Sequence, residues 1–304
     1  MRTFRAFFML LACIGLLVTF VIDPPVASAA QPVGGLSADG EDPPAPDACG
    51  ARIAKKRGGY WECTFNDEFS GTELDRTKWL GAQTEISGIA NGDVCTRDEP
   101  WTISVKGGML RLTARKLLNP FLCKSPYGNF RTDRAAAAVS TRDRFSQAYG
   151  RFEVRAKMPD TTVQGLHSAI WLFPDQNLYG LWPLSGEIDI AEWYSGIPQY
   201  AYPSLHYADG LNDGVTGLTA YLRNASAFHT YAVEWSPDLM LFYYDGRLVY
   251  ETRWRPILPL FGNQPFDKPF NMILTQAWGG AWNAPVAATP TKATMTIDWV
   301  RVWQ

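Results

Sequence analysis

The sequence lacks the short motifs of several large enzyme classes and carries almost no net charge. No GxSxG nucleophile elbow, GxGxxG fingerprint or P-loop occurs, so the usual markers of serine hydrolases, dinucleotide-binding domains and P-loop NTPases are missing. The 304 residues hold 28 Lys and Arg against 30 Asp and Glu, a formal net charge of −2. Without a basic surplus, nothing in the composition indicates a nucleic-acid partner. No Cys-x-x-Cys pair occurs, so the cysteines match a zinc site poorly.

Long runs of helical periodicity are also missing, and short strand-like segments take their place. Aromatic residues make up 13% of the chain, and 26 Gly and 21 Pro punctuate it, which favours strands and turns over a helix bundle. Asp245-Gly246 predicts a hairpin turn. Segments that alternate apolar and polar residues, or are short and aromatic, are Met109–Ala114, Ala148–Lys157, Tyr231–Trp235, Met240–Tyr244 and Met295–Trp303. We therefore predict an all-β protein built as a sandwich of two sheets.

The first thirty residues have the pattern of a secretory signal peptide. A basic start precedes an apolar run over residues 6–22, and Ala27-Ser28-Ala29 offers a small-residue cleavage site. A retained membrane anchor is the alternative, although the run is short for crossing about 30 Å of hydrocarbon. Residues 31–59 are rich in Gly, Pro, Ala and Asp and then basic, which predicts a flexible leader. The composition of residues 60–304 is uniform, so we predict a single domain there.

Export would place four cysteines of the mature chain in an oxidising compartment, where they predict two disulfides. Four cysteines allow three connectivities. The pairing Cys49–Cys63 with Cys95–Cys123 is favoured because the members of each pair lie close in the sequence. We expect a secreted, extracellular protein that has no membrane partner after cleavage. Nothing in the sequence requires an oligomer, so we expect a monomer.

The densest chemistry of the sequence lies in the segment Ser185–Glu192 (SGEIDIAE), where Glu187, Asp189 and Glu192 fall within six residues. Residues two apart on a strand share a face, so Glu187 and Asp189 project together, whereas Glu192 has the wrong parity. One extra residue, a β-bulge near Ile190-Ala191, would return Glu192 to the acidic face. Three carboxylates on one face raise one another's pKa values, and glycoside hydrolysis uses such a pair as acid and nucleophile or base.

A solvated strand with its charges outward is the simpler interpretation of this alternation. The aromatic residues around the cluster favour catalysis on a sugar, because their faces stack on the apolar edges of sugar rings. Trp182, Trp193 and Tyr194 flank the acids, and Trp171 lies upstream. For any single tryptophan, burial in the core is the competing role.

With these residues the chain resembles glycoside hydrolase family 16, near the bacterial endo-1,3-β-glucanases of the laminarinase type. Glu187 to Glu192 match the bulged form of that family's signature, ExDxxE. Further segments resemble the family in the same order and extend the match over nearly all of residues 60–304: Phe65–Phe69 with Leu74-Asp75 and Trp79, Tyr149–Arg155, Phe228–Tyr231 through Glu234-Trp235, Gly279-Gly280 with Trp282, and Asp298–Val302.

The resemblance implies a β-jelly-roll (concanavalin A-like) sandwich with a glycan cleft, and retaining hydrolysis of a β-linked polysaccharide. Glu187 would be the nucleophile and Glu192 the general acid/base, with Asp189 tuning their charge. His206 matches a cleft histidine. Trp171 and Trp182 match aromatic positions near the cleft, and we add Trp193, Tyr194, Trp278 and Trp282 to the candidate substrate-binding residues. No cofactor is expected for catalysis.

The resemblance also implies a structural calcium ion in many relatives, with matching ligands here at Glu68, Asp298 and the carbonyl of Gly108. Ordinary surface charge is the alternative for both carboxylates. The chain departs from the family at His167-Ser168-Ala169, where relatives often read Trp-Pro-Ala, and at Trp278, where a small apolar residue is usual. These departures bear on the sugar subsites and leave the carboxylates untouched.

Three functions compete at this point. The first is a secreted endo-acting β-glucanase, most consistent with a 1,3-β-glucan substrate. The second keeps the fold but acts as a transglycosylase or on another polysaccharide, such as a mixed-linkage glucan or a galactan. The third is a non-catalytic glycan-binding protein, which has no need of all three acids.

Overall fold

The computed structural model describes residues 44–56, 58–88, 93–208 and 216–304, and within them the chain is almost entirely β-structure. The two short helical segments there are α1 (Thr84–Ser87) and the 3-10 turn η1 (Ala281–Asn283). The predicted fold class is therefore confirmed. The predicted signal peptide and the first part of the predicted leader lie outside the described residues. In the described part of the chain, no helix is long and apolar enough to cross a membrane.

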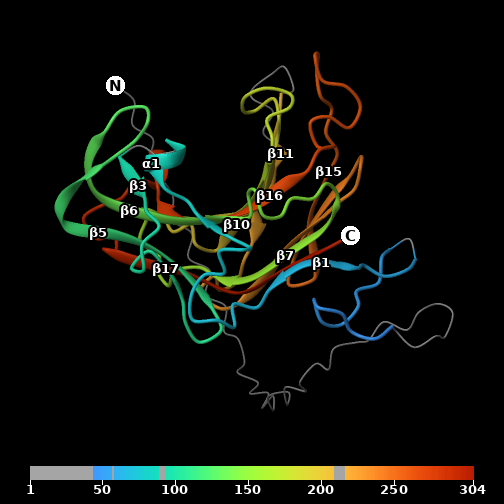
Figure 1. Ribbon diagram of the computed structural model, residues 1–304, viewed down its shortest axis with the longest axis horizontal. Helices are drawn as coiled ribbons and strands as arrows, with labels where there is room; N and C mark the ends of the chain where they lie inside the picture. Colours follow the sequence, from blue (N-terminus) through green and yellow to red (C-terminus); the bar gives the residue numbers. More distant parts are fainter. Residues whose placement is uncertain (1–43, 57, 89–92, 209–215) are drawn as a thin grey trace, which may run out of the picture. The chain divides into compact units, whose positions relative to one another are not determined.

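The strands form two layers, which Figure 1 shows with β6, β10 and β16 above β17, β7 and β1. One layer, the inner sheet, carries the acidic segment. Its strands in spatial order are β2 (Leu80–Gly81), β6 (Phe130–Ser140), β16 (Phe270–Trp278), β8 (Leu166–Pro174), β9 (Glu187–Tyr194) and β10 (Tyr200–His206), with β11 (Thr216–Gly217) and β12 (Ala220–Tyr221) on the far edge of β10. Every pairing within this sheet is antiparallel.

The second layer, the outer sheet, is centred on β17 (Lys292–Trp303), which pairs with β7 (Gly150–Lys157) on one side. Its remaining strands are β1 (Cys63–Asp67), β3 (Val94–Thr96), β4 (Ile103–Val105), β5 (Leu110–Cys123), β13 (His229–Trp235), β14 (Met240–Tyr244) and β15 (Arg247–Thr252). β14 and β15 form the hairpin predicted at Asp245-Gly246, and both turn residues have the positive φ that such a turn requires.

The two sheets are joined by strand β6, which contributes its first half to one and its second half to the other. Around Ala135, β6 pairs with β5 and, in parallel, with β3; around Val139 it pairs with β16 and β2. The space between the layers is filled by large apolar side chains such as Trp79, Phe152 and Trp235, all essentially inaccessible to solvent. This continuous core gives the inner sheet a rigid backing.

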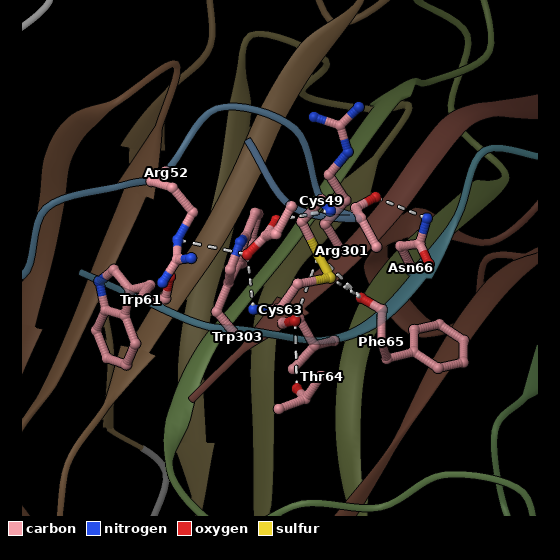
Figure 2. Close-up of a disulfide and its surroundings, with 12 residues drawn as sticks. Cys49, Arg52, Trp61, Cys63, Thr64, Phe65, Asn66, Arg301 and Trp303 are labelled. Atoms are coloured by element: carbon pink, nitrogen blue, oxygen red, sulfur yellow. Dashed lines mark hydrogen bonds and ion pairs between the residues drawn. A yellow bond between two sulfur atoms is a disulfide. The ribbon is translucent and has the colours of Figure 1, made fainter. Parts of the chain in front are cut away.

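Both predicted disulfides are confirmed: Cys49 bonds Cys63, and Cys95 bonds Cys123. Figure 2 shows how the first of them ties the end of the predicted leader to β1. The carboxylate of Asp47 accepts hydrogen bonds from the backbone N–H groups of Cys49 and Cys63, and Arg52 Nε donates to the carbonyl of Trp61. Residues 44–56 are thus held against the sheet by covalent and polar contacts. The two disulfides also fit an oxidising compartment.

Candidate active site

A bulge in strand β9 decides which side chains share its outer face. Along β8, Ile170 is opposite Ala191, while the next residue, Trp171, is opposite Asp189, so Ile190 has no partner. The register with β10 shifts at the same place. The bulge predicted near Ile190-Ala191 is therefore present. It shifts the alternation of side chains along β9 by one residue.

As a result, the three acids lie on one face of β9 and the apolar residues between them lie on the other. Ile188, Ile190 and Ala191 have no exposed surface and belong to the core. Tyr194, two residues beyond Glu192, continues the acidic face and donates its hydroxyl to Glu192 Oε1 at 2.9 Å. The inner sheet therefore presents a row of carboxylates backed by a packed apolar layer.

Asp189 is the most enclosed of the three acids, and two residues of β10 hold it. Ser204 donates its hydroxyl to Asp189 Oδ2 at 2.7 Å, and His206 Nε2 lies 3.0 Å from the same oxygen. Carboxylate oxygens of Glu187 and Asp189 and a ring nitrogen of His206 all lie within 4.8 Å of one another. The other ring nitrogen of His206, Nδ1, is buried and finds no hydrogen-bond partner among the described residues.

Glu187 is held by a tryptophan from the loop that precedes β9. Trp182 donates its indole N–H to Glu187 Oε2 at 2.6 Å, and its ring lies 5.7 Å from the ring of His206. Trp182 is nevertheless 46% exposed to solvent. This residue therefore combines a hydrogen bond to a candidate catalytic acid with an aromatic surface that is open to a ligand.

Glu192 has two hydrogen-bond partners at a single oxygen. Besides Tyr194, His167 Nε2 lies 3.1 Å from Glu192 Oε1. His167 lies in the segment that departs from the pattern of the resembled family, but the sequence gave no sign that it would contact an acid 25 residues further along the chain. Ser204 and Tyr202 were also missed, although they alternate with His206 along β10 and so share its face.

Burial and mutual repulsion change the acidity of the cluster. Desolvation, followed by the charge of Asp189, raises the pKa of Glu187 to about 8. Desolvation likewise raises the pKa of Asp189, against the hydrogen bond from His206. The pKa of His206 rises to about 9, because its contact with Asp189 outweighs the desolvation that would lower it. His206 is therefore a cation at neutral pH.

Glu192 behaves differently although it is equally enclosed. Desolvation raises its pKa, but the hydrogen bond and the charge interaction with His167, together with the hydrogen bond from Tyr194, outweigh this and the net pKa is lowered. In the free protein, the raised pKa of Glu187 therefore favours its protonated form, and the lowered pKa of Glu192 favours its ionised form.

A cavity of about 660 Å³ opens beside these residues on the outer face of the inner sheet. Its walls are mainly aromatic and polar, and the described residues that line it are Glu192, Tyr194, Ile197, Tyr202, Ser204, His206, Gly217, Leu218, Thr219 and Trp282. Trp282 is exposed, and its ring lies 5.1 Å from that of Tyr194. Concave sites with aromatic walls and a few convergent polar groups are typical of ligand pockets.

The remaining candidate residues divide into two groups. Trp171 pairs with Asp189 in register and so shares its face, and its indole donates to Thr275. The prediction that Trp193 and Trp278 bind substrate is wrong, because both side chains are fully buried in the core and present no surface to a sugar. Trp193 has the opposite parity to Glu192 and bonds the carbonyl of Pro198. Trp278 bonds the carbonyl of Ala135 beneath the inner sheet.

The residues of the calcium prediction are engaged elsewhere. Glu68 forms a two-pronged pair with Arg301, at 2.8 and 3.1 Å, and Asp298 is bonded to Arg155. Among the described residues, the groups of side chains close enough to hold a metal do not include either carboxylate. In the structure, a guanidinium group therefore neutralises each of these two carboxylates. The ligand set, including the carbonyl of Gly108, stays a prediction.

Comparison with known proteins agrees with this geometry. The protein-family model described as "Beta-porphyranase A-D, GH16 domain" matches residues 61–304 of the chain. The chain is 32% identical over 267 residues to a β-glucanase of Rhodothermus marinus, covering 81% of this chain and 86% of that protein. It is 30% identical over 248 residues to a keratan-sulfate endo-1,4-β-galactosidase of Sphingobacterium multivorum, covering 80% of this chain and 55% of that protein.

The fold is likewise similar to solved structures. The X-ray structure of the laminarinase from Rhodothermus marinus superposes with a TM-score of 0.67 at 31% sequence identity, covering 80% of this chain and 97% of that one. The likeness thus covers four fifths of this chain and nearly all of the laminarinase chain.

Proposed function

The chain belongs to glycoside hydrolase family 16, and on that premise we propose that it is an endo-acting enzyme that hydrolyses a 1,3-β-glucan with retention of anomeric configuration. That it is a glycoside hydrolase, and that its substrate is a polysaccharide, follow from the family and from the β-glucanase relatives. The linkage, the endo mode and the stereochemistry are the proposal. It is supported by the resemblance to laminarinases and by the one-sided acidic strand.

In the first step, a carboxylate oxygen of Glu187 attacks the anomeric carbon and forms a covalent ester. The bond from that carbon to the glycosidic oxygen breaks, and the leaving oxygen takes the proton of Glu192. Trp182 donates to Glu187 Oε2, which orients the carboxylate and leaves its other oxygen available for attack. The cationic His206 beside Asp189 limits the negative charge that would otherwise accumulate around the nucleophile.

In the second step, a water molecule enters opposite the ester. Glu192, now ionised, removes one of its protons while the water oxygen bonds to the anomeric carbon. The bond to Glu187 breaks and both acids regain their initial state. Two inversions at one carbon give net retention.

The proposal requires the proton to lie on Glu192 in the substrate complex, although the free protein favours Glu187. A glycosidic oxygen that accepts a hydrogen bond from Glu192 favours the protonated form of that acid. Because neighbouring carboxylates titrate as a pair, protonation of Glu192 promotes ionisation of Glu187. Substrate binding therefore drives the transfer that the first step needs.

The observation that carries the proposal is the β9 bulge, since without the extra Ile190 the two glutamates would face opposite sides of the sheet. A lectin would gain nothing from three mutually repelling acids that raise the cost of burying the strand. Retained binding with no turnover on any substrate would nevertheless favour that role.

Another polysaccharide is the second candidate, because the matching family model is described by β-porphyranases and one relative is a keratan-sulfate endo-β-galactosidase. The deciding experiment measures reducing ends released from 1,3-β-glucan, mixed-linkage β-glucan, agarose, porphyran and keratan sulfate, with Glu187→Gln as the inactive control. Release from 1,3-β-glucan alone supports the proposal. Release from a galactan alone keeps the mechanism and discards the glucan, and lengthened chains would identify a transglycosylase.

We also propose that the protein acts outside the cell as a monomer. The two disulfides support an oxidising compartment, and the predicted signal peptide supports export. Mass spectrometry of the protein from the culture medium tests cleavage after Ala29 or nearby. Light scattering of the purified protein tests the monomer.

A further inference from the structure

The ring of His167 contacts both the acid Glu192 and the ring of Tyr194, in a position that the catalytic acids alone do not explain. We propose that His167 is a positioning residue that, together with Tyr194, fixes Glu192 Oε1, so that Oε2 is the oxygen that exchanges the proton with the glycosidic bond. The inference rests on the proposed role of Glu192 as the general acid/base.

The position of His167 follows from the register of the inner sheet. His167 on β8 is directly opposite Tyr194 on β9, and the two rings are stacked with centroids 4.7 Å apart and planes 11° from parallel. On its other side β8 pairs with β16, where Ala277 is opposite His167 and leaves room for the imidazole. The ring is thus held by its stack on Tyr194 while Nε2 is directed at the acid.

The donors on Oε1 determine which oxygen carries the proton. The Tyr194 hydroxyl donates to Oε1, and it stays protonated because burial and the negative Glu192 raise its pKa. The histidine atom at 3.1 Å from this oxygen is Nε2, which donates to the ionised carboxylate when the imidazole carries hydrogen at that position. An oxygen that accepts two hydrogen bonds is a poor site for a proton of its own, so the proton of Glu192 resides on Oε2.

The same contacts set the range of pH over which Glu192 can act. The ionisable groups around it are Glu187, Asp189 and Tyr194 on its own strand, His206 and Tyr202 on β10, and His167 on β8. Of these, the acids and desolvation favour the protonated form, and His206 favours the ionised form. His167 makes the largest contribution against desolvation. Its removal should therefore leave Glu192 protonated up to a higher pH.

Two replacements separate the hydrogen bond from the ring stack. His167→Phe keeps an aromatic ring against Tyr194 but has no N–H group, whereas His167→Gln can donate an N–H group but cannot stack. His229→Gln is the matched control, because that histidine is on the outer sheet and pairs with Asp245 instead. Thermal melting of each variant verifies folding before any other measurement.

The primary readout needs no substrate. It is the titration of the Glu192 side-chain carboxyl group, followed by the NMR signal of its Cδ carbon in protein labelled at that carbon of glutamate. The Glu192 signal is assigned by its loss in Glu192→Gln. We expect the midpoint to rise by about one pH unit in His167→Phe, to rise by less in His167→Gln, which keeps an N–H donor but not the charge, and to stay near the wild-type value in His229→Gln. An unchanged midpoint in His167→Phe overturns the proposal. This titration is informative even if the wild-type protein hydrolyses none of the glycans, so failure of the proposed function is distinguishable.

The second readout is kinetic, on the glycan that the wild-type enzyme cleaves. We expect His167→Phe to lower kcat about tenfold at the wild-type optimum with KM within about twofold, and to move the basic limb of the kcat/KM profile to higher pH. His167→Gln should recover most of kcat. A loss confined to KM would identify His167 as a substrate contact and contradict a positioning role.

Discussion

His206 Nε2 lies 3.0 Å from Asp189 Oδ2, and this pair places a positive charge directly beside the carboxylate of Glu187. The charge balance of the site depends on this pair, because Glu187, Asp189 and Glu192 all lie on one face of the single strand β9. The proton of the glutamate pair and the charge of His206 together decide how stability and activity vary with pH.

Folding stability should fall as the pH rises from about 5 to 9. The pKa of Glu187 is raised from 4.5 to about 8 and that of His206 from 6.5 to about 9. The folded protein therefore holds protons in this window that the unfolded chain has released, and the free energy of unfolding decreases with rising pH. Glu192, whose pKa is lowered, affects the pH dependence of the free energy of unfolding only below about pH 4.5.

Glu187→Gln removes the first of these contributions. One pKa unit corresponds to about 1.4 kcal/mol. Between pH 5 and 8, the free energy of unfolding should therefore fall by roughly 1–3 kcal/mol less in the variant than in the wild type. Urea denaturation at pH 5, 6.5, 8 and 9 measures this, with Glu73→Gln on an exposed loop as the control. Parallel curves for wild type and Glu187→Gln would show that Glu187 ionises normally in the folded protein.

Neutralising either catalytic glutamate should abolish turnover without unfolding the protein. Glu187→Gln removes the nucleophile and Glu192→Gln removes the proton donor, and each should lower kcat at least about 10³-fold. Glycan binding, measured by calorimetry, should survive because Gln has the shape of Glu. A near wild-type rate in either variant would refute the role assigned to that residue.

Azide should rescue the alanine variants and reveal which glutamate has which role. In Glu187→Ala, azide would attack the substrate directly and invert its configuration, giving an α-glycosyl azide. In Glu192→Ala, azide would attack the covalent intermediate and give the β-anomer. NMR of the product distinguishes the two. Exchange of the two outcomes would assign the acid to Glu187, the order that the free protein's proton favours.

Trp282 should contribute to substrate binding rather than to chemistry. Trp282 is exposed on the cavity wall, and its ring lies against that of Tyr194. We expect Trp282→Ala to raise KM about 5- to 10-fold, equivalent to about 1–1.4 kcal/mol, with kcat nearly unchanged. Tyr127→Ala removes an exposed aromatic residue that does not line the cavity, and it should leave KM as it is. Equal effects of both changes would indicate a non-specific cause.

Much of the inner sheet was predictable because a strand repeats every two residues. Ile188 and Ile190 alternate with Glu187 and Asp189, and the wrong parity of Glu192 required a bulge that the structure contains. The disulfide pairs followed from sequence proximity, and the β14–β15 hairpin followed from Asp245-Gly246. These are local features, in which the residues that interact are neighbours along the chain.

The partners of the acids were decided by tertiary structure. His167 meets Glu192 because β8 and β9 pair in one register, and a shift of one residue would turn His167 into the core. The same geometry buried Trp193 and Trp278, which the sequence alone could not distinguish from cleft tryptophans. Sequence composition and spacing thus determined the sheets, the acidic face and the family, whereas the pairing of distant strands set the proton positions, because acidity depends on which groups approach within a few ångströms.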